Sequence, residues 1–134
     1  MESFLLASSV RAIVGQRLVR VLCEHCKQSH RLTAADLATD ERYAALGFRA
    51  GDVVHVPKGC QWCASTGFHG RQGAFEVIEV TPRVRQAIGV KTDASDLEKV
   101  ARQEGMTTMT EDGVAKCRAG VTTVDEVFRV TASL

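Results

Sequence analysis

The sequence predicts an α+β protein, mainly helical, in which a small four-cysteine zinc-binding lobe with short strands is followed by a C-terminal bundle of short helices. Three observations predict this fold class. Four of the five cysteines form two C-x-x-C pairs, at residues 23–26 and 60–63. Short β-branched segments lie beside the second pair. Helical patterns with recognisable starts and ends fill residues 81–134, and the whole chain has about the size of one ordinary domain.

The composition is that of a folded chain. Apolar residues make up 45% and charged residues 25% of the sequence, which excludes disorder as the main state. The net charge of +1 is too small for a protein that binds nucleic acid mainly by neutralising phosphates. A basic excess up to Arg31 is interpreted equally well as a solvated face or as a docking surface. No apolar run approaches the roughly 18 residues of a membrane helix, and no signal peptide is recognised, so we expect a cytoplasmic chain without direct membrane insertion.

The paired cysteines are the most specific signal. Two thiolates three residues apart on a tight turn can bind one metal ion, and two such turns supply the four-sulfur shell that structural zinc prefers. Disulfides would require an oxidising compartment, and covalent haem would require histidine at the positions of Lys27 and Ala64. Iron in the same sulfur geometry stays open. We therefore predict one structural zinc ion, with no coordination position left for a substrate, bound by Cys23, Cys26, Cys60 and Cys63.

The first half of the chain carries weaker patterns. Apolar residues at helical spacing predict an amphipathic helix over residues 3–16, ending near Gly15. A mixed basic and apolar segment then leads to the first cysteine pair. Thr33 or Asp36 is expected near the start of a short helix, which a further turn or two over 40–46 continues. Residues 53–56 predict a strand that leads to the second pair.

Beyond the second pair, glycines at 67, 70 and 73 predict a tight turn, followed by a strand over 74–80. Thr81-Pro82 has the form of a helix N-cap with proline at the first helical position. Ser95 and Glu98 predict a capping box for the next helix, residues 106–119 predict a third, and Thr123 with Glu126 predicts a capping box for the last. The expected domains are a helix and connector over 1–22, the zinc lobe over 23–80, and a helical subdomain over 81–134.

No motif for catalysis stands out. The phosphate-binding pattern G-x-x-x-x-G-K-[ST] is missing, and no Ser-His-Asp set or carboxylate pair with catalytic spacing is recognised. The Asp125-Glu126 pair follows two threonines and is interpreted as part of a helix start. Cys117 is interpreted as a packing residue, and His25 as a solvated or supporting histidine near the metal. We expect that this chain alone catalyses no reaction.

Three segments carry a resemblance to a known family. They are residues 16–27 (QRLVRVLCEHCK), residues 59–76 (GCQWCASTGFHGRQGAFE), and the closing pattern of 106–113 (MTTMTEDG), 119–123 (AGVTT) and Glu126-Val127. Together they resemble the C-terminal region of the type II secretion system ATPases (GspE-like) and of their relatives that assemble type IV pili. The departures at Ala74 and Phe75 put no chemistry in doubt.

The resemblance implies that the chain is the C-terminal part of a longer hexameric ATPase. It implies that ATP and magnesium are bound only by the full-length parent, which would power type II protein secretion from the cytoplasm, peripheral to the inner membrane through partner proteins. The implied partners are neighbouring subunits of a homohexamer and an inner-membrane platform. Under this interpretation Arg17 and Arg20 face an adjacent subunit, while Arg71 and Glu76 support the glycine turn through an ion pair or contact a neighbour.

Other interpretations are kept beside this one. The first is a type IV pilus assembly ATPase fragment. The second is a free-standing zinc ribbon that binds nucleic acid, suggested by Trp62 and Phe68 among basic residues. The third is a zinc module of the co-chaperone type, which the number of C-x-x-C repeats disfavours. We expect no nucleic-acid partner, because charge and aromatic content are both low.

Overall fold

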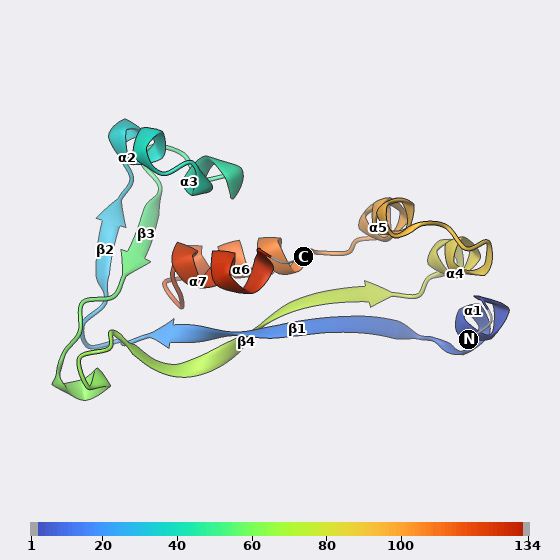
Figure 1. Cartoon of the computed structure of the whole chain (residues 1–134), viewed down its shortest axis with the longest axis horizontal. Helices are drawn as coiled ribbons and strands as arrows, with labels where there is room; N and C mark the ends of the chain where they lie inside the picture. Colours follow the sequence, from blue (N-terminus) through green and yellow to red (C-terminus); the bar gives the residue numbers. More distant parts are fainter. Residues whose placement is uncertain (1–2, 133–134) are drawn as a thin grey trace. The chain divides into compact units, whose positions relative to one another are not determined.

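The computed structural model describes residues 3–132. Within them lie seven α-helices, four β-strands and one 3-10 helix (Figure 1), so the α+β class is confirmed. The chain divides into two compact units, one formed by residues up to 16 with 75–108, the other by 17–74 with residues from 109 on. No helix in the described range is long and apolar enough to cross a bilayer.

The first unit contains α1 (Ser3–Ser9), the start of β1 (Ala12–Leu22), the end of β4 (Phe68–Glu79), α4 (Pro82–Gly89) and α5 (Ala94–Gln103). Its core is built from the buried side chains of Val80, Val84 and Ala101. The predicted start of α4 is confirmed, because the Thr81 side chain accepts a hydrogen bond from the backbone N–H of Val84 and proline occupies the first turn.

Three expectations in this part of the chain are wrong. The helix over 3–16 ends at Ser9, and residues 12–22 form β1 instead. Its β-branched residues favour an extended backbone, and β4 is its partner in a two-stranded sheet, drawn in Figure 1 as two opposed arrows. β4 begins at Phe68, so Gly70 and Gly73 lie inside a strand. α5 is capped by Asp93, which accepts from the N–H of Asp96, in place of the expected box at Ser95 and Glu98.

The second unit contains the cysteine pairs. The short strands β2 (Gln28–Arg31) and β3 (Val53–Val56) pair antiparallel, with Gln28 opposite Val56 and Arg31 opposite Val53. Between them lie α2 (Ala34–Thr39) and α3 (Arg42–Ala45), and the 3-10 helix η1 (Gln61–Cys63) covers the second cysteine pair. The expected Thr33 start is confirmed: Thr33 and Asp36 cap α2 reciprocally.

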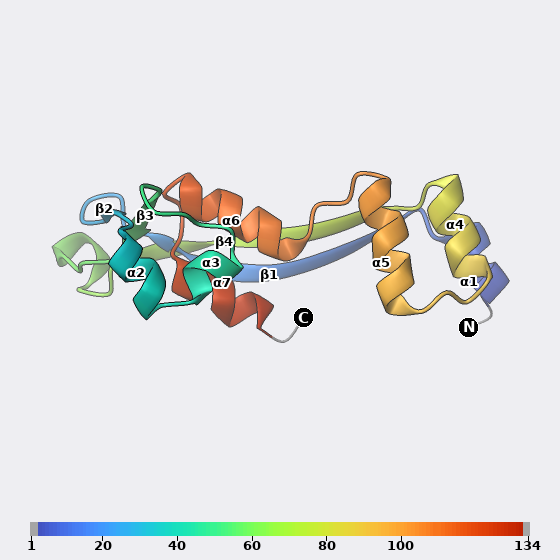
Figure 2. The ribbon, with the colours of Figure 1, turned by 90° about the horizontal axis from the view of Figure 1, so that it is seen from above.

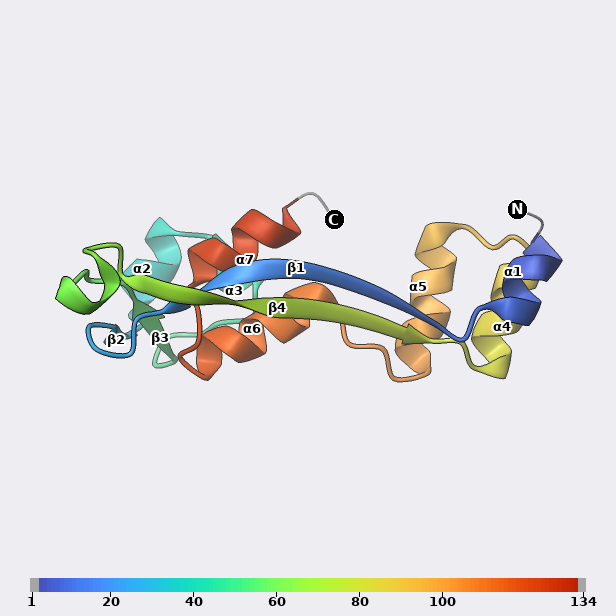
Figure 3. The same ribbon diagram turned by 90° about the horizontal axis from the view of Figure 1, so that it is seen from below.

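Helices α6 (Met109–Arg118) and α7 (Val124–Thr131) complete this unit. Figures 1 and 3 place both on the same face of the β1–β4 pair, where Val19, Ala74, Met109 and Val130 form a small buried cluster. A larger core joins the helices to the β2–β3 hairpin (Figure 2) and includes Leu32, Phe48, Val54, Cys117, Val124 and Val127. The helices after residue 81 therefore divide between the two units and do not form one bundle.

Candidate metal centre

The four cysteines that the sequence singles out come together. Their Sγ atoms all lie within 4.8 Å of one another. Three of the Sγ–Sγ distances are 3.8 Å, namely Cys23–Cys60, Cys26–Cys63 and Cys60–Cys63. A tetrahedral ion with metal–sulfur bonds of about 2.3 Å requires sulfur–sulfur separations of about 3.8 Å. The cluster therefore fits one four-coordinate metal ion, and the sulfurs are too far apart for disulfide bonds.

The first cysteine turn follows directly from the end of β1. The backbone N–H groups of Cys26 and Lys27 both donate to the carbonyl of Cys23, at 3.3 and 3.0 Å, which closes the turn. On its outer side, Leu22 N–H donates to the carbonyl of Val121 at 2.8 Å, and Lys27 Nζ donates to that of Gly120 at 3.0 Å. The loop between α6 and α7 thus supports the first turn.

The second turn has a matching form. Cys63 N–H and Ser65 N–H donate to the carbonyl of Cys60, at 3.3 and 2.8 Å. Ala64 and Ser65 adopt φ values of 53° and 64°, a left-handed conformation that turns the chain back toward the sulfur cluster. Cys23 N–H donates to the carbonyl of Gly67 at 2.9 Å, so a backbone hydrogen bond joins the two turns.

Backbone N–H groups also donate to the sulfurs. Gly59 donates to Cys26 Sγ at 3.3 Å, while Cys60 and Gly67 donate to Cys63 Sγ at 3.2 and 3.1 Å. Burial by itself raises the pKa of the Cys63 thiol, but these donors outweigh it and the pKa falls below its usual range. The pKa of Cys60 is raised, chiefly by burial. The cluster is thus prepared to hold thiolate charge, the form in which cysteine binds a metal.

Glycine is required at position 67. Its φ is +83°, and a Cβ added there would lie 2.4 Å from the Cβ of Pro57. The same residue donates its N–H to Cys63 and accepts from Cys23. The tight approach of the two turns therefore depends on the missing side chain.

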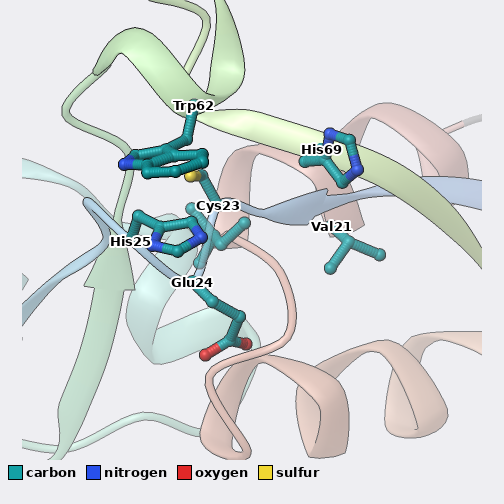
Figure 4. A pocket seen from close by; sticks show the side chains of 7 residues that line it. Val21, Cys23, Glu24, His25, Trp62 and His69 are labelled. Atoms are coloured by element: carbon teal, nitrogen blue, oxygen red, sulfur yellow. The ribbon is translucent and has the colours of Figure 1, made fainter.

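Histidine does not join the sulfur cluster. Within residues 3–132, the metal-ligand type side chains that gather in one place are the four cysteines. His25 instead stacks on Trp62, with ring centroids 4.7 Å apart and planes inclined by 19°. Figure 4 shows this stack, in which each ring comes from the interior of a different C-x-x-C turn. Sequence analysis noted both residues but could not pair them, because the turns lie far apart in the chain.

The four residues expected at interfaces lie on the two long strands. Arg17 is exposed on β1, Arg71 is exposed on β4, and Glu76 is partly exposed on β4. Arg20 contacts its own chain: it pairs with Glu126 at 3.2 Å, and its guanidinium lies 4.1 Å from the centre of the Phe68 ring. The proposed contacts of these residues with a neighbouring subunit stay predictions.

Glu126 is the residue that sequence analysis misjudged most. Its side chain is only 2% exposed and is ionised between Arg20 and Arg129. It accepts hydrogen bonds from the backbone N–H of Arg20 at 2.8 Å and from both guanidinium groups. Burial raises its pKa, but the donors from Arg129 and Arg20 prevail and lower the pKa to about 2. The expected capping threonine is confirmed, since Thr123 accepts from Glu126 N–H, yet the carboxylate serves this ion pair.

Comparison with known proteins gives consistent results. The family model described as "Type II/IV secretion system protein" matches residues 1–129. The chain is 33% identical to the type IV pilus assembly ATPase PilB of Thermus thermophilus, over 97% of this chain and 14% of that protein. It is 36% and 38% identical to the type II secretion system protein E of Pseudomonas aeruginosa and of Dickeya dadantii, over 97% of this chain and 25% of each relative. The chain therefore spans about a quarter or less of the length of these relatives.

Proposed function

The chain belongs to the type II/IV secretion system protein family, and on that premise we propose that it is the zinc-binding, non-hydrolysing C-terminal part of a longer ATPase that powers type II protein secretion. The relatives named as ATPases or as secretion system protein E are several times longer than this chain, which leaves room for a separate nucleotide-binding part. The 134 residues of the chain lack the phosphate-binding motif that ATP hydrolysis by this class requires.

The observation that carries the proposal is the four-sulfur cluster. Two turns far apart in the chain bring the Sγ atoms to the spacing of a tetrahedral ion. The residues that would hold zinc are Cys23, Cys26, Cys60 and Cys63, and when bound the ion would act as a structural cross-link between the two turns. Because protein sulfurs fill all four positions, the site gives rigidity to a projecting lobe and supplies no reaction centre.

We place this lobe in the cytoplasm, peripheral to the inner membrane, with neighbouring subunits of a homohexamer and an inner-membrane platform protein as its partners. ATP and magnesium are bound elsewhere in the parent protein. Arg17 and Arg71 are available for such contacts because their side chains are exposed. Arg20 and Glu76 are more involved in their own surroundings, since Arg20 is paired with Glu126 and Glu76 is partly buried.

A second candidate is assembly of type IV pili. It is favoured by relatives named type IV pilus assembly ATPase PilB, whose identities of 33% and 34% are close to the 34% to 38% of the secretion proteins. Both candidates assign the same role to the lobe and differ in the machine that the parent protein drives.

The metal part of the proposal is tested on the purified chain. Elemental analysis should find one zinc per chain, and the absence of visible absorption bands would exclude iron bound by four thiolates. Cys60→Ser should release the metal and expose residues 23–63 to protease, because structural zinc supplies much of the folding free energy of a small lobe. Cys117→Ala is the matched control, since Cys117 is a buried thiol outside the cluster and its loss should leave the metal in place. Unchanged metal content in Cys60→Ser would overturn the assignment.

The cellular part is tested in the source organism. Reading the DNA upstream of the Met1 codon should find an open frame with a phosphate-binding loop. Disruption of that frame should stop the export of proteins across the outer membrane, whereas loss of surface pili alone would transfer the assignment to the second candidate. Hydrolysis of ATP by the 134-residue chain itself would contradict the proposal that this part is not catalytic.

A further inference from the structure

A pocket lies beside the metal centre and has no part in metal binding. It encloses about 320 Å³, which is at the lower end of the range for ligand sites. Figure 4 shows Trp62 and His25 on one side of it, with Val21 and His69 on the other and Glu24 at its lower edge. The walls of the pocket are therefore mostly apolar and aromatic, with acceptor groups at the rim.

The charged groups of the pocket have one sign. Of the side chains that line it, Glu24 is acidic and Cys23 is one of the four thiol groups, and none is lysine or arginine. If the zinc site forms as proposed, four thiolates and one divalent ion leave a net charge of −2 next to the pocket. Neutral imidazoles at His25 and His69 each add an acceptor nitrogen. Such surroundings favour a cation and repel a phosphate.

The Glu24 carboxylate can accept a further donor. Lys27 Nζ donates to its Oε1 at 3.0 Å and also to the carbonyl of Gly120. The Glu24 side chain is 74% exposed, and a carboxylate offers acceptor sites on both oxygens. Lys27 thus holds the carboxylate in place without saturating it.

The aromatic side of the pocket is also well presented. Trp62 is 64% exposed, an unusual position for a tryptophan, and the stacked His25 ring supports one of its faces. Planar guanidinium groups stack on such rings, and the aliphatic stem of arginine packs on apolar walls like that of Val21.

We propose that this pocket binds an arginine side chain presented by a partner protein. The stem lies along Val21, the guanidinium lies against Trp62, and Glu24 accepts from it. Because His25 and Trp62 come from the two separate cysteine turns, the pocket takes this shape only while the turns are held together. In this respect the inference rests on the proposed metal site and extends it, since the metal would assemble a recognition surface.

Trp62 is the sole tryptophan, so its fluorescence reports on the pocket directly. The metal-loaded full chain is titrated with the blocked peptide acetyl-Gly-Ser-Arg-Ser-Gly-amide, by fluorescence and by calorimetry. The companion peptide carries citrulline, which keeps the shape of arginine and lacks its charge. We expect saturable binding of the arginine peptide and at least about tenfold weaker binding of the citrulline peptide, as loss of a charge-assisted contact predicts.

Variants locate the binding. Trp62→Leu, followed by calorimetry, should weaken the arginine peptide about tenfold, and Glu24→Gln about fivefold. Glu98→Gln is the matched control, because Glu98 is an exposed carboxylate of α5 that does not line the pocket, and its affinity should stay within about twofold. Metal content is measured on every sample, which separates failure of the arginine pocket from failure of the metal site.

Four results would overturn the inference. They are no binding of the arginine peptide at about 1 mM, the weakest affinity at which a specific site is expected; equal binding of the citrulline peptide; indifference to both Trp62→Leu and Glu24→Gln; and tighter binding of a single-stranded oligonucleotide. The last result would revive the nucleic-acid interpretation of the exposed tryptophan.

Discussion

Replacement of Gly67 by alanine tests the geometry that brings the two cysteine turns together. At φ +83°, an alanine is disfavoured by about 1–2 kcal/mol relative to glycine. The added Cβ would also lie 2.4 Å from Pro57 Cβ and 3.2 Å from its Cα, so part of the second turn must move. Crowding of this kind costs about 1–3 kcal/mol. Because Gly67 also donates to Cys63 and accepts from Cys23, the displacement acts directly on the metal ligands.

Gly70 provides the matched control. Its φ is +81°, and a Cβ built on it meets no atom within 4 Å. Gly70→Ala therefore carries the backbone cost of Gly67→Ala without the crowding. The difference between the two variants isolates the close approach of the turns.

The assay is equilibrium unfolding in guanidinium with buffered zinc, together with competition for the metal by a chromophoric chelator. Gly67→Ala should be less stable than Gly70→Ala by about 1–3 kcal/mol. The same difference should appear as about tenfold to hundredfold weaker metal binding. Equal stability and equal metal affinity of the two variants would refute the proposed role of the Gly67 contact with Pro57.

Three further predictions concern groups outside the metal site. Glu126→Gln should lower the free energy of unfolding by about 2–3 kcal/mol at pH 7. The pKa of Glu126 is lowered from 4.5 to about 2, so denaturant unfolding should show this deficit undiminished above pH 5 and shrinking as the pH falls toward 2. Cys117 should react slowly with a thiol reagent at pH 8 while the protein is folded, since burial raises its pKa to about 12; rapid labelling before unfolding would contradict this. Thr81→Ala should cost about 1 kcal/mol in the same unfolding assay, because Thr81 caps α4 and donates to Glu104 at 2.8 Å; an unchanged midpoint would argue against that cap.

The features that sequence analysis predicted correctly are local ones. The caps at Thr33, Thr81 and Thr123 depend on contacts within one helical turn, so the pattern of a few residues suffices to find them. The cysteine pairs are predictable for a similar reason, because the C-x-x-C spacing determines that each turn presents two sulfurs together.

The wrong predictions involve partners far along the chain. Residues 10–16 have apolar spacing that suits a helix, but β4 offers them a strand partner more than fifty residues later, and β-branched Ile13 and Val14 accept the extended form. Glu126 stands where a capping glutamate belongs, yet the arginine across from it on β1 claims the carboxylate. In both cases a tertiary contact overrides a correct local tendency.

The metal centre is tied to the rest of its unit by backbone hydrogen bonds on two sides. Cys23 connects to Gly67, while Leu22 and Lys27 connect to Val121 and Gly120 between α6 and α7. A hydroxyl contact from Thr122 to the carbonyl of Arg20, at 2.7 Å, extends the second connection to the start of the buried Glu126 ion pair. Loss of the ion would therefore loosen the loop that orients α7 as well as the cysteine turns. It follows that a structural metal here stabilises a recognition surface and a helix pair together, because both depend on the same first turn.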